Sequence, residues 1–263
     1  APTVTFDNVT FAYPGGRRAT HEGLNFKVNA GERIGFVGPS GVGKTSIVRL
    51  LLRFYDPDKG SVKIGGHDLR DLTFDDIRRQ IAVVNQDTYL FHGTVEDNLR
   101  IGKPDATKDE IEAACRAANA WGFVHKLPSG YATVIGERGI RLSGGQRQRV
   151  EIARVVAQAP ELMCADEPVS NLDPVQSADI LSLLSNSGHQ LNTSLVMIIH
   201  HPALAARHAE RIIGMANGRI VYDGDTQTPL DAVALRSIYG RSIPPGPVSE
   251  LHRDNYPSHD HVA

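Results

Sequence analysis

The chain has 263 residues, of which 41% are hydrophobic and 22% are charged, so it can bury a core in one large domain or two closely packed ones. This composition excludes the disordered and fibrous classes of protein. The formal net charge is -2, and acidic and basic residues are interspersed, so no chain-wide field favours nucleic acid or an anionic membrane. The only cysteines, Cys115 and Cys164, form no C-x-x-C pair, and we expect them to be reduced and buried.

No apolar stretch approaches the ~20 residues that a membrane-spanning helix needs, and no signal peptide opens the sequence. We therefore expect no direct insertion into a membrane. If the chain serves a membrane protein, the membrane part is expected to lie elsewhere.

Short apolar segments alternate with turn signals and helical patterns along most of the chain. The first half predicts strands at 4–6, 24–28 and 33–37, a helix from near Gly43, a helical segment from Phe74 leading into a strand at 81–84, and a helix at 107–120. Residues 88–135 look mostly helical. The second half predicts a helix from Ser143 to about Ala157, a strand at 162–165, a helix at 174–184 and a strand at 195–199. Strands that alternate with helices imply an α/β fold with a parallel sheet covered on both faces.

The composition changes after Gly240, where prolines interrupt a stretch rich in His, Asp and Ser. Such a stretch is too polar to pack a core, which predicts a flexible tail at 241–263. His252, His259 and His261 could bind a metal, but histidines without fixed spacing are usually solvated.

The sequence from Gly38 to Thr45 reads Gly-Pro-Ser-Gly-Val-Gly-Lys-Thr and matches the P-loop pattern G-x-x-x-x-G-K-S/T. It lies between a predicted strand and a predicted helix, which makes a chance glycine-rich turn improbable. Backbone N–H groups of such a loop, and the helix N-terminus after it, face phosphate oxygens. We expect Mg²⁺-bound ATP here, with Lys44 on the β- and γ-phosphates and the Thr45 hydroxyl on Mg²⁺. The expected nucleotide-binding residues of this loop are Gly38, Ser40, Gly41, Gly43, Lys44, Thr45 and Ser46.

An apolar segment at 161–165 ends in two acids, Asp166 and Glu167, as a Walker B strand does. Because side chains alternate along a strand, Asp166 can reach the Mg²⁺ shell while Glu167 faces the attacking water. Glu167 is therefore the candidate general base. Two solvated acids at a strand end are common in isolation, but this alternative is weak beside an intact P-loop.

A third motif, Leu142-Ser143-Gly144-Gly145-Gln146, resembles the LSGGQ signature of ATP-binding cassette (ABC) proteins. A Ser- and Gly-rich turn at a helix N-terminus can bind an anion. In the resembled family this anion is a phosphate of ATP on the P-loop of a second subunit. The resemblance therefore implies an ATP-dependent dimer with a second cassette domain, in which Ser143, Gly144, Gly145 and Gln146 contact the nucleotide.

Smaller motifs occur in the order expected for this family. Tyr13 matches the aromatic residue that stacks on adenine, although alone it would pass for a turn tyrosine. Gln86 matches the Q-loop glutamine, which the resemblance places on Mg²⁺ or the attacking water. Residues 170–173 match the D-loop, which crosses to the opposite subunit and ends in Asp173.

The switch histidine has two candidates, because His200 and His201 both follow the predicted strand at 195–199. Importer-type spacing, counted back from the Ala-Glu-Arg run at 209–211, selects His200. Exporter-type spacing selects His201. We favour His200.

The resemblance implies the ABC ATPase fold: a P-loop NTPase core with a mainly parallel sheet and flanking helices, an antiparallel β subdomain and an α-helical subdomain. The expected divisions are a first part of the ATP-binding core at 1–85, the helical subdomain at 86–145, a second part of the core at 146–240 and the tail at 241–263.

The two halves resemble different members of the family. Residues 3–150 resemble the nucleotide-binding domain of a lipid or multidrug exporter, on segments such as 54–57, 86–91, 94–98, 127–131 and 136–139. Residues 161–240 resemble the ATPase subunit of a phosphonate importer, on segments such as 210–215, 218–224 and 235–240. These affinities suggest a chimera joined between Ser143 and Pro160, or else a single divergent lineage.

The function implied is an ATPase that powers transport through transmembrane domains, at the cytoplasmic face of a membrane. One alternative is a natural or engineered chimeric cassette domain that binds ATP but is coupled to no transporter. Another is a cassette that acts on DNA or ribosomes. The interval from Lys44 to Leu142 holds no heptads or cysteine clusters and the chain has one P-loop, so we expect no nucleic-acid partner.

Overall fold

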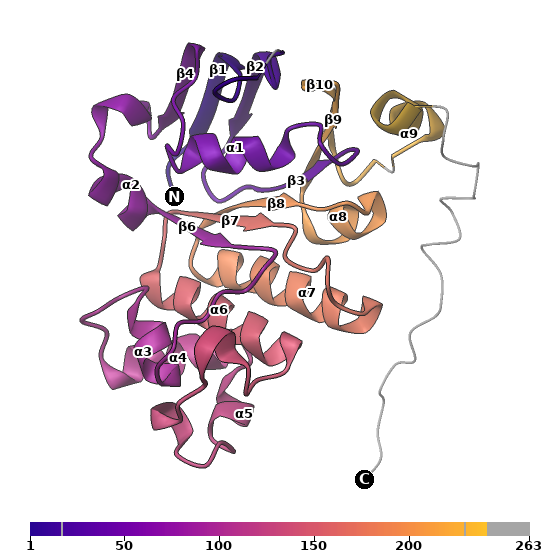
Figure 1. Ribbon diagram of the computed structural model, residues 1–263. Coiled ribbons are helices and arrows are strands. Elements are labelled where there is room, and N and C mark those ends of the chain that lie inside the picture. Colours follow the sequence, from indigo (N-terminus) through magenta and orange to yellow (C-terminus); the bar gives the residue numbers. More distant parts are fainter. Residues whose placement is uncertain (17, 229, 241–263) are drawn as a thin grey trace.

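A computed structural model describes residues 1–16, 18–228 and 230–240, in two sheets and a set of helices (Figure 1). The first sheet is antiparallel, in the order β2-β1-β4-β5. Its strands are β1 (Val4–Phe11), β2 (His21–Val28), β4 (Lys59–Ile64) and β5 (His67–Asp68). The predicted tail at 241–263, including His252, His259 and His261, lies outside the described residues.

The second sheet has six strands, in the order β10-β9-β3-β8-β7-β6. Neighbouring strands from β9 to β6 pair in parallel, whereas β10 pairs with β9 in antiparallel fashion. The strands are β3 (Arg33–Val37), β6 (Ile81–Val84), β7 (Leu162–Asp166), β8 (Ser194–Ile198), β9 (Arg211–Ala216) and β10 (Arg219–Asp225). The carboxyl ends of β3, β6, β7 and β8 therefore lie at one edge of this sheet.

Helices cover both faces of the parallel sheet, with α1 between the two sheets and α6 and α7 on the opposite face (Figure 1). The helices are α1 (Lys44–Leu51), α2 (Phe74–Gln80), α3 (Val95–Arg100), α4 (Lys108–Ala117), α5 (Trp121–Val124), α6 (Gly144–Gln158), α7 (Pro174–Gln190), α8 (Pro202–His208) and α9 (Ala232–Tyr239). The short helices α3, α4 and α5 pack beyond α6, at the end of the molecule far from the antiparallel sheet (Figure 1).

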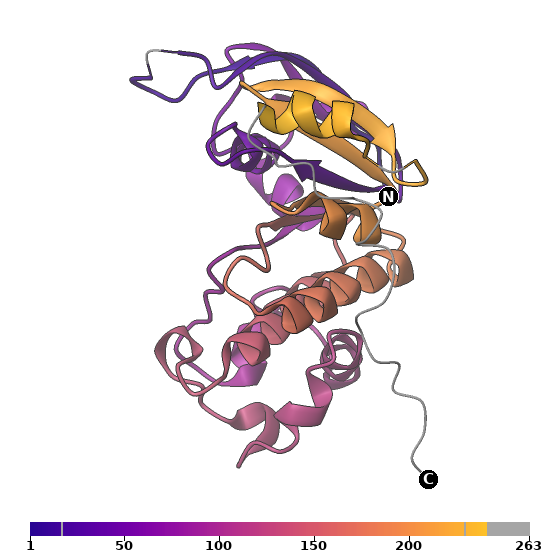
Figure 2. The same ribbon diagram turned by 90° about the vertical axis from the view of Figure 1, so that its right-hand side faces the viewer.

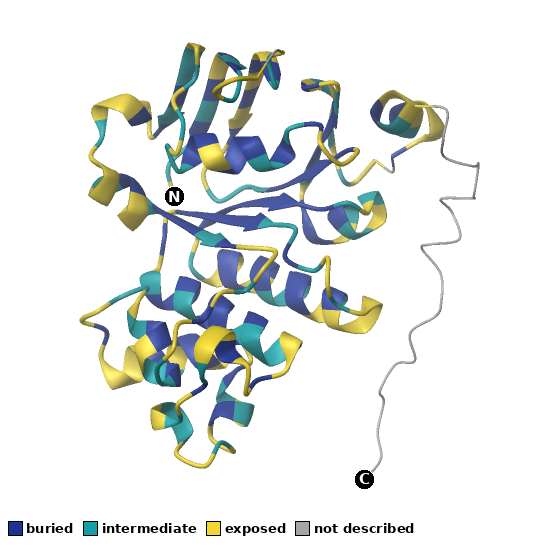
Figure 3. Ribbon diagram, viewed as in Figure 1, coloured by how far each residue is buried: buried dark blue, intermediate teal, exposed yellow. Residues whose placement is uncertain are grey.

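Two hydrophobic cores lie on opposite faces of the parallel sheet, because alternate side chains of a strand point to opposite sides. On β7, Cys164 belongs to the core shared with α1 and the antiparallel sheet, whereas Met163 belongs to the core shared with α6 and α7. Strands β7 and β8 of this sheet are accordingly almost wholly buried (Figure 3), whereas the residues of β10 at its edge alternate between exposed and half-buried. Cys164 and Cys115 are free, buried thiols, as predicted.

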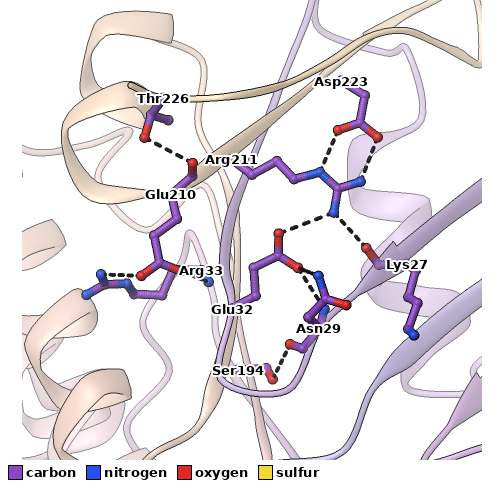
Figure 4. Close-up of polar contacts among 9 residues, drawn as sticks. All are labelled: Lys27, Asn29, Glu32, Arg33, Ser194, Glu210, Arg211, Asp223 and Thr226. Carbon is purple, nitrogen blue, oxygen red and sulfur yellow. Dashed lines mark hydrogen bonds and ion pairs between the residues drawn. The ribbon is translucent and has the colours of Figure 1, made fainter. Parts of the chain in front are cut away.

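A charged cluster joins the antiparallel sheet to the edge of the parallel sheet (Figure 4). Arg211, the first residue of β9, donates to both carboxylate oxygens of Asp223 on β10, at 2.5 and 2.6 Å. It also donates to the Lys27 backbone oxygen at 2.9 Å and to Glu32 at 3.2 Å. Hydrogen bonds to Asp223 raise the pKa of Arg211, and the guanidinium links β10 to the end of β2 and to Glu32.

The predicted elements agree with the structure where the sequence pattern is strong. The strands at 33–37 and 81–84 have the predicted bounds, and the predicted strands at 4–6 and 24–28 prove to be the parts of longer ones. Residues 88–135 are helical only in short pieces, α3, α4 and α5, separated by turns and 3-10 segments. Strands β4, β5, β9 and β10 and helices α8 and α9 have no counterpart among the predicted elements.

Within residues 1–16, 18–228 and 230–240, no helix has both the length and the apolar character that crossing a bilayer requires. Across the same residues, no group of three or more His, Cys, Asp or Glu side chains is arranged to hold a metal ion.

Candidate nucleotide-binding site

The P-loop connects the end of β3 to the start of α1, at the carboxyl edge of the parallel sheet (Figure 1). Gly43 precedes α1 with a φ of 104°, in the region that favours glycine. A β-carbon on Gly38 would collide with the backbone oxygen of Met215 on β9. These two glycines therefore allow the loop to curl tightly while it stays packed against the neighbouring strand.

Lys44 lies inside this curl rather than in solvent. Its side chain is buried, and Nζ donates to the backbone oxygens of Gly38 at 2.8 Å and Pro39 at 2.9 Å. Burial lowers the pKa of Lys44, although the charges of Glu167 and Asp166 oppose this effect. The loop thus holds an ammonium group close to two acids.

Thr45 and Asp166 come together at the end of β7, although 121 residues separate them in sequence. The Thr45 hydroxyl donates to Oδ1 of Asp166 at 3.1 Å. Burial raises the pKa of Asp166, and the hydrogen bond from Thr45 lowers it. A hydroxyl and a carboxylate side by side are hard oxygen donors of the kind that Mg²⁺ prefers, so this pair fits the expected metal.

Gln86 follows β6, the strand beside β7, and its side chain is exposed. Among the described residues, Gln86 makes no hydrogen bond to Thr45 or to Asp166. The structure therefore brings it to the same edge of the sheet as the Thr45–Asp166 pair without joining it to that pair.

Glu167 and His200 form the next contact at this edge. Nε2 of His200 lies 2.6 Å from Oε1 of Glu167. The Glu167 backbone has a left-handed φ of 50°, and its N–H donates to the Ile198 oxygen at 3.1 Å, which ties it to the end of β8. His201 is exposed and stands at the N-cap of α8. Of the two candidate switch histidines, the structure places His200 against Glu167.

These contacts define a group of side chains that we call the phosphate cluster. It contains Lys44, Thr45, Asp166, Glu167 and His200. Its members come from the P-loop and from the ends of β7 and β8, so the parallel sheet brings them to one edge.

Tyr13 lies beside the phosphate cluster, against α1. Its hydroxyl lies 2.8 Å from Oγ of Ser46, and Arg49 donates to the same hydroxyl at 3.1 Å. Its ring packs edge-on against Phe11 and Tyr55. The ring of Tyr13 is thus held at a fixed place relative to the P-loop helix.

The segment Ser143–Gln146, which we call the signature turn, forms the start of α6. The Ser143 hydroxyl accepts from the Gln146 N–H at 3.3 Å, and the Gln146 side chain accepts from the Ser143 N–H at 3.0 Å. Asp173 caps α7 in a similar way and accepts from the Gln176 N–H at 2.9 Å. A β-carbon on Gly145 would lie 3.1 Å from the side-chain oxygen of Gln176, so the signature turn lies beside the D-loop of its own chain.

The signature turn and the P-loop helix lie on opposite faces of the parallel sheet (Figure 1). The structure therefore gathers the phosphate cluster within one chain and leaves Ser143, Gly144, Gly145 and Gln146 outside it.

One buried residue of the site, His21, was not predicted from the sequence. Its ring nitrogens lie 3.1 Å from the Gly43 oxygen and 3.2 Å from the Gly218 oxygen. Burial lowers the pKa of His21, and both backbone contacts oppose this effect. The His21 ring thus contacts the backbone of the P-loop at Gly43. Because its partners are 22 and 197 residues away, local spacing could not identify it.

A glycine-rich loop between a parallel strand and a helix, with a lysine, a threonine and two acids gathered at its mouth, defines a P-loop nucleotide-binding fold. The family model described as "ABC transporter" matches residues 21–170. The chain belongs to the ABC transporter family, and its fold is the ABC ATPase fold.

Exporters of this family resemble the chain closely. A bacterial Atm1-family ABC exporter solved with ATP bound superposes with a TM-score of 0.81 and 38% identity, over 90% of this chain and 41% of the exporter chain. The multidrug resistance protein pgp-1 of Caenorhabditis elegans is 41% identical over 84% of this chain and 17% of its own length. The ATM1-type heavy metal exporter of Novosphingobium aromaticivorans is 40% identical over 85% of this chain and 36% of its own length. The chain spans less than half the length of each of these proteins.

The matches also bear on the hypothesis of a chimera. An alignment over 223 residues of a 263-residue chain extends through both the 3–150 and the 161–240 segments. The same exporters therefore match both halves, and the suggestion of an exporter–importer chimera receives no support from them.

Proposed function

We propose that this chain is the nucleotide-binding domain of an exporter, which binds and hydrolyses Mg²⁺-bound ATP to drive movement of a substrate across a membrane. The observation that carries the proposal is the phosphate cluster, in which Thr45 pairs with Asp166 and His200 pairs with Glu167 beside the P-loop. Family membership and the resemblance to exporters support the same conclusion.

The residues of the cluster have distinct roles in this proposal. The P-loop N–H groups, the N-terminus of α1 and Lys44 bind the phosphates of ATP. Thr45 and Asp166 would hold Mg²⁺, together with Gln86 at the end of β6, and the ion would supply neutralisation of the phosphate charge. Tyr13 stacks on the adenine.

Glu167 acts as the general base in this proposal. Its carboxylate accepts a proton from the attacking water, and it orients this water toward the terminal phosphate. His200, which already contacts Glu167, stabilises the charge that develops at the transferred phosphoryl group. Positioning and charge stabilisation dominate phosphoryl transfer, so a group that holds the base in place affects the rate directly.

In the proposed dimer, the signature turn of one cassette domain completes the nucleotide site formed by the P-loop of the other domain. Ser143, Gly144, Gly145 and Gln146 begin a 15-residue helix, whose first N–H groups have no partner within the helix and suit a phosphate. Because the signature turn lies on the opposite face of the sheet from α1, it is available to ATP bound on another copy. Asp173, beside this turn, is proposed to line the same contact.

A membrane domain is the proposed partner, at the cytoplasmic face of the membrane. Exposed apolar side chains lie on two neighbouring loops that follow β6 and precede α6. They are Tyr89, Phe91, Val134 and Ile140, with exposed fractions of 46, 49, 40 and 79%. Ile135 donates to the Gly93 oxygen at 3.0 Å, which holds the two loops side by side. In subdomain terms, we propose core segments at 1–85 and 146–240 and a helical subdomain at 86–145.

The substitution Glu167→Gln tests the proposal, because it keeps the size of the side chain and removes the base. We expect ATP hydrolysis to fall by about a hundredfold or more while ATP binding persists. With hydrolysis blocked, Mg²⁺-bound ATP should convert the protein to a dimer, measured by light scattering coupled to gel filtration.

Glu161→Gln is the matched control, since Glu161 is an exposed acid that precedes β7 at the other end of that strand. The control should hydrolyse ATP like the parent and show no trapped dimer. A Glu167→Gln protein that turns over ATP at the parent rate, or stays monomeric at saturating Mg²⁺-bound ATP, would contradict the proposal.

A further inference from the structure

The last described helix, α9, packs against β9 and β10, the two strands at one side of the parallel sheet. It begins at a capped turn, where the Asp231 side chain accepts from the Ala234 N–H at 2.7 Å. Ile238 is buried against Gly214 of β9, where any β-carbon would collide with it. Figure 2 shows α9 lying across β9 and β10, on the side of the molecule that also carries α8. The position of α9 is therefore fixed by the sheet.

Tyr239, at the end of α9, reaches the loop that holds His200. Its hydroxyl donates to the His200 backbone oxygen at 3.1 Å. Burial raises the pKa of Tyr239 to about 12, although a hydrogen bond with the Gly38 backbone opposes the rise. The phenol thus keeps its proton at neutral pH and remains a donor. The hydroxyl thus contacts the backbone of the residue that faces Glu167.

The His200 peptide lies between two regular elements. Ile199 still pairs with the sheet, since its N–H donates to the Phe36 oxygen at 3.0 Å, and His201 already caps α8. A backbone group outside regular structure takes its orientation from side chains or water. The contact from Tyr239 supplies that orientation from an element 39 residues further along the chain.

We propose that Tyr239 is a positioning residue of the hydrolytic site, which holds the His200 peptide so that the imidazole faces Glu167. The inference rests on the proposed function for its effect on rate, but the positioning itself does not depend on catalysis. It assigns α9, which lies beyond the matched segment at 21–170, a part in positioning His200. A displacement of α9 would release His200 while leaving the residues that bind nucleotide in place.

The variant Tyr239→Phe removes the hydroxyl and keeps the ring, so α9 should stay packed. We expect kcat for ATP to fall about fivefold, the rate effect of one neutral hydrogen bond, while the KM for ATP changes less than about twofold. Tyr222→Phe is the matched control, because Tyr222 lies on β10 near the same helix and its hydroxyl makes no hydrogen bond to any described residue. The control should keep the parent kcat and KM. An unchanged kcat in Tyr239→Phe, or equal losses in both variants, would overturn the proposal.

To distinguish an action through His200 from a merely structural role, Tyr239→Phe is repeated in a His200→Ala background. If Tyr239 acts through His200, Tyr239→Phe should have no further effect on kcat there. An equal fivefold loss in both backgrounds would show that Tyr239 acts elsewhere and would overturn the proposal.

A readout without turnover distinguishes failure of this inference from failure of the proposed function. In protein labelled with ¹⁵N-histidine, the His200 ring resonances, assigned by their loss in His200→Ala, should shift in Tyr239→Phe and not in Tyr222→Phe. Such a shift in a chain without ATPase activity would leave the positioning intact and refute the proposed function. Active protein with unshifted His200 resonances would refute only the positioning.

Discussion

The phosphate cluster and the signature turn are built in opposite ways. In the phosphate cluster, side chains meet across long distances in sequence, as Thr45 and Asp166 do, because parallel strands end at a common edge. In the signature turn, Ser143 and Gln146 bond to each other within one turn of helix. The first group needs the whole sheet for its geometry. The second needs only its own helix.

This difference has a functional meaning. Under the proposed function, a cluster that a folded chain assembles by itself binds nucleotide as a monomer. A turn that satisfies its own cap, on the opposite face of the sheet, is proposed to act when a second copy brings a phosphate to it. Nucleotide binding and dimerisation should therefore be separable by mutation.

The largest effect is expected at Lys44. The variant Lys44→Ala removes a buried ammonium that donates to two P-loop oxygens and faces Asp166 and Glu167. We expect affinity for Mg²⁺-bound nucleotide to fall about a hundredfold or more, since a charge-assisted contact to phosphate is lost in a buried site. Calorimetric titration measures this.

Lys108→Ala is a suitable control, because Lys108 opens α4 at an exposed position outside the phosphate cluster. It should bind nucleotide like the parent. If Lys44→Ala bound nucleotide with an affinity within about threefold of the parent, the assignment of the phosphate cluster as the nucleotide site would be wrong.

The sequence predicted the elements whose pattern is local. β3, β7 and β8 are short apolar strands, and α1 is a helix that follows a recognised loop; all four lie close to their predicted positions. β10 was missed because its residues alternate between half-buried and exposed, so it lacks the apolar run that identified the other strands. Helix α9 was missed as well; it is only eight residues long.

Contacts between distant residues could not be predicted from spacing. Motifs in the sequence named Asp166, Glu167 and His200, but only the folded sheet shows that His200 faces Glu167 and His201 does not. The segment 235–240 carried only a resemblance to an importer subunit and no role for Tyr239, whose contact with His200 depends on how α9 docks on Gly214.

Glu151 offers a second test, because it lies on the helix that joins the two regions. Its side chain is fully buried on α6, where it accepts from the Asn85 N–H at 3.4 Å and pairs with Arg154 at 3.3 Å. Burial raises the pKa of Glu151 to about 7, although Arg154 opposes the rise. The folded chain therefore binds this proton more tightly than the unfolded chain does. Its stabilising contribution is complete at low pH and is lost as pH rises through about 7.

Glu151→Gln mimics the protonated acid at every pH. Relative to the parent, its free energy of unfolding should rise by on the order of 2 kcal/mol between pH 5 and pH 8, as measured by urea denaturation. Glu112→Gln should stay nearly constant relative to the parent over this range, because the hydrogen bond from Arg116 lowers the pKa of Glu112 and its contribution is lost only at pH values below the ordinary glutamate pKa of about 4. A difference between Glu151→Gln and the parent that stays constant over this range would contradict the prediction.

The smallest effect is expected at Ser143, where it tests the signature turn separately from the phosphate cluster. Ser143→Ala removes the hydroxyl that caps α6, which should lower the free energy of unfolding by about 1 kcal/mol. Thr107→Ala removes the same kind of cap from α4, where Thr107 and Glu110 form an identical reciprocal pair, and should cost a similar amount. The two variants thus match in stability and differ only in which helix start is altered.

Their effects on assembly should differ. In the Glu167→Gln background, Ser143→Ala should weaken the ATP-dependent dimer about tenfold while nucleotide affinity of the monomer stays at its parent value, since one hydrogen bond to a charged phosphate is lost. Thr107→Ala should leave the dimer unchanged. Concentration-dependent sedimentation measures both. Equal weakening by the two caps would mean that Ser143 acts only through helix stability, and the signature turn would then lose its proposed role in binding a phosphate on the partner copy.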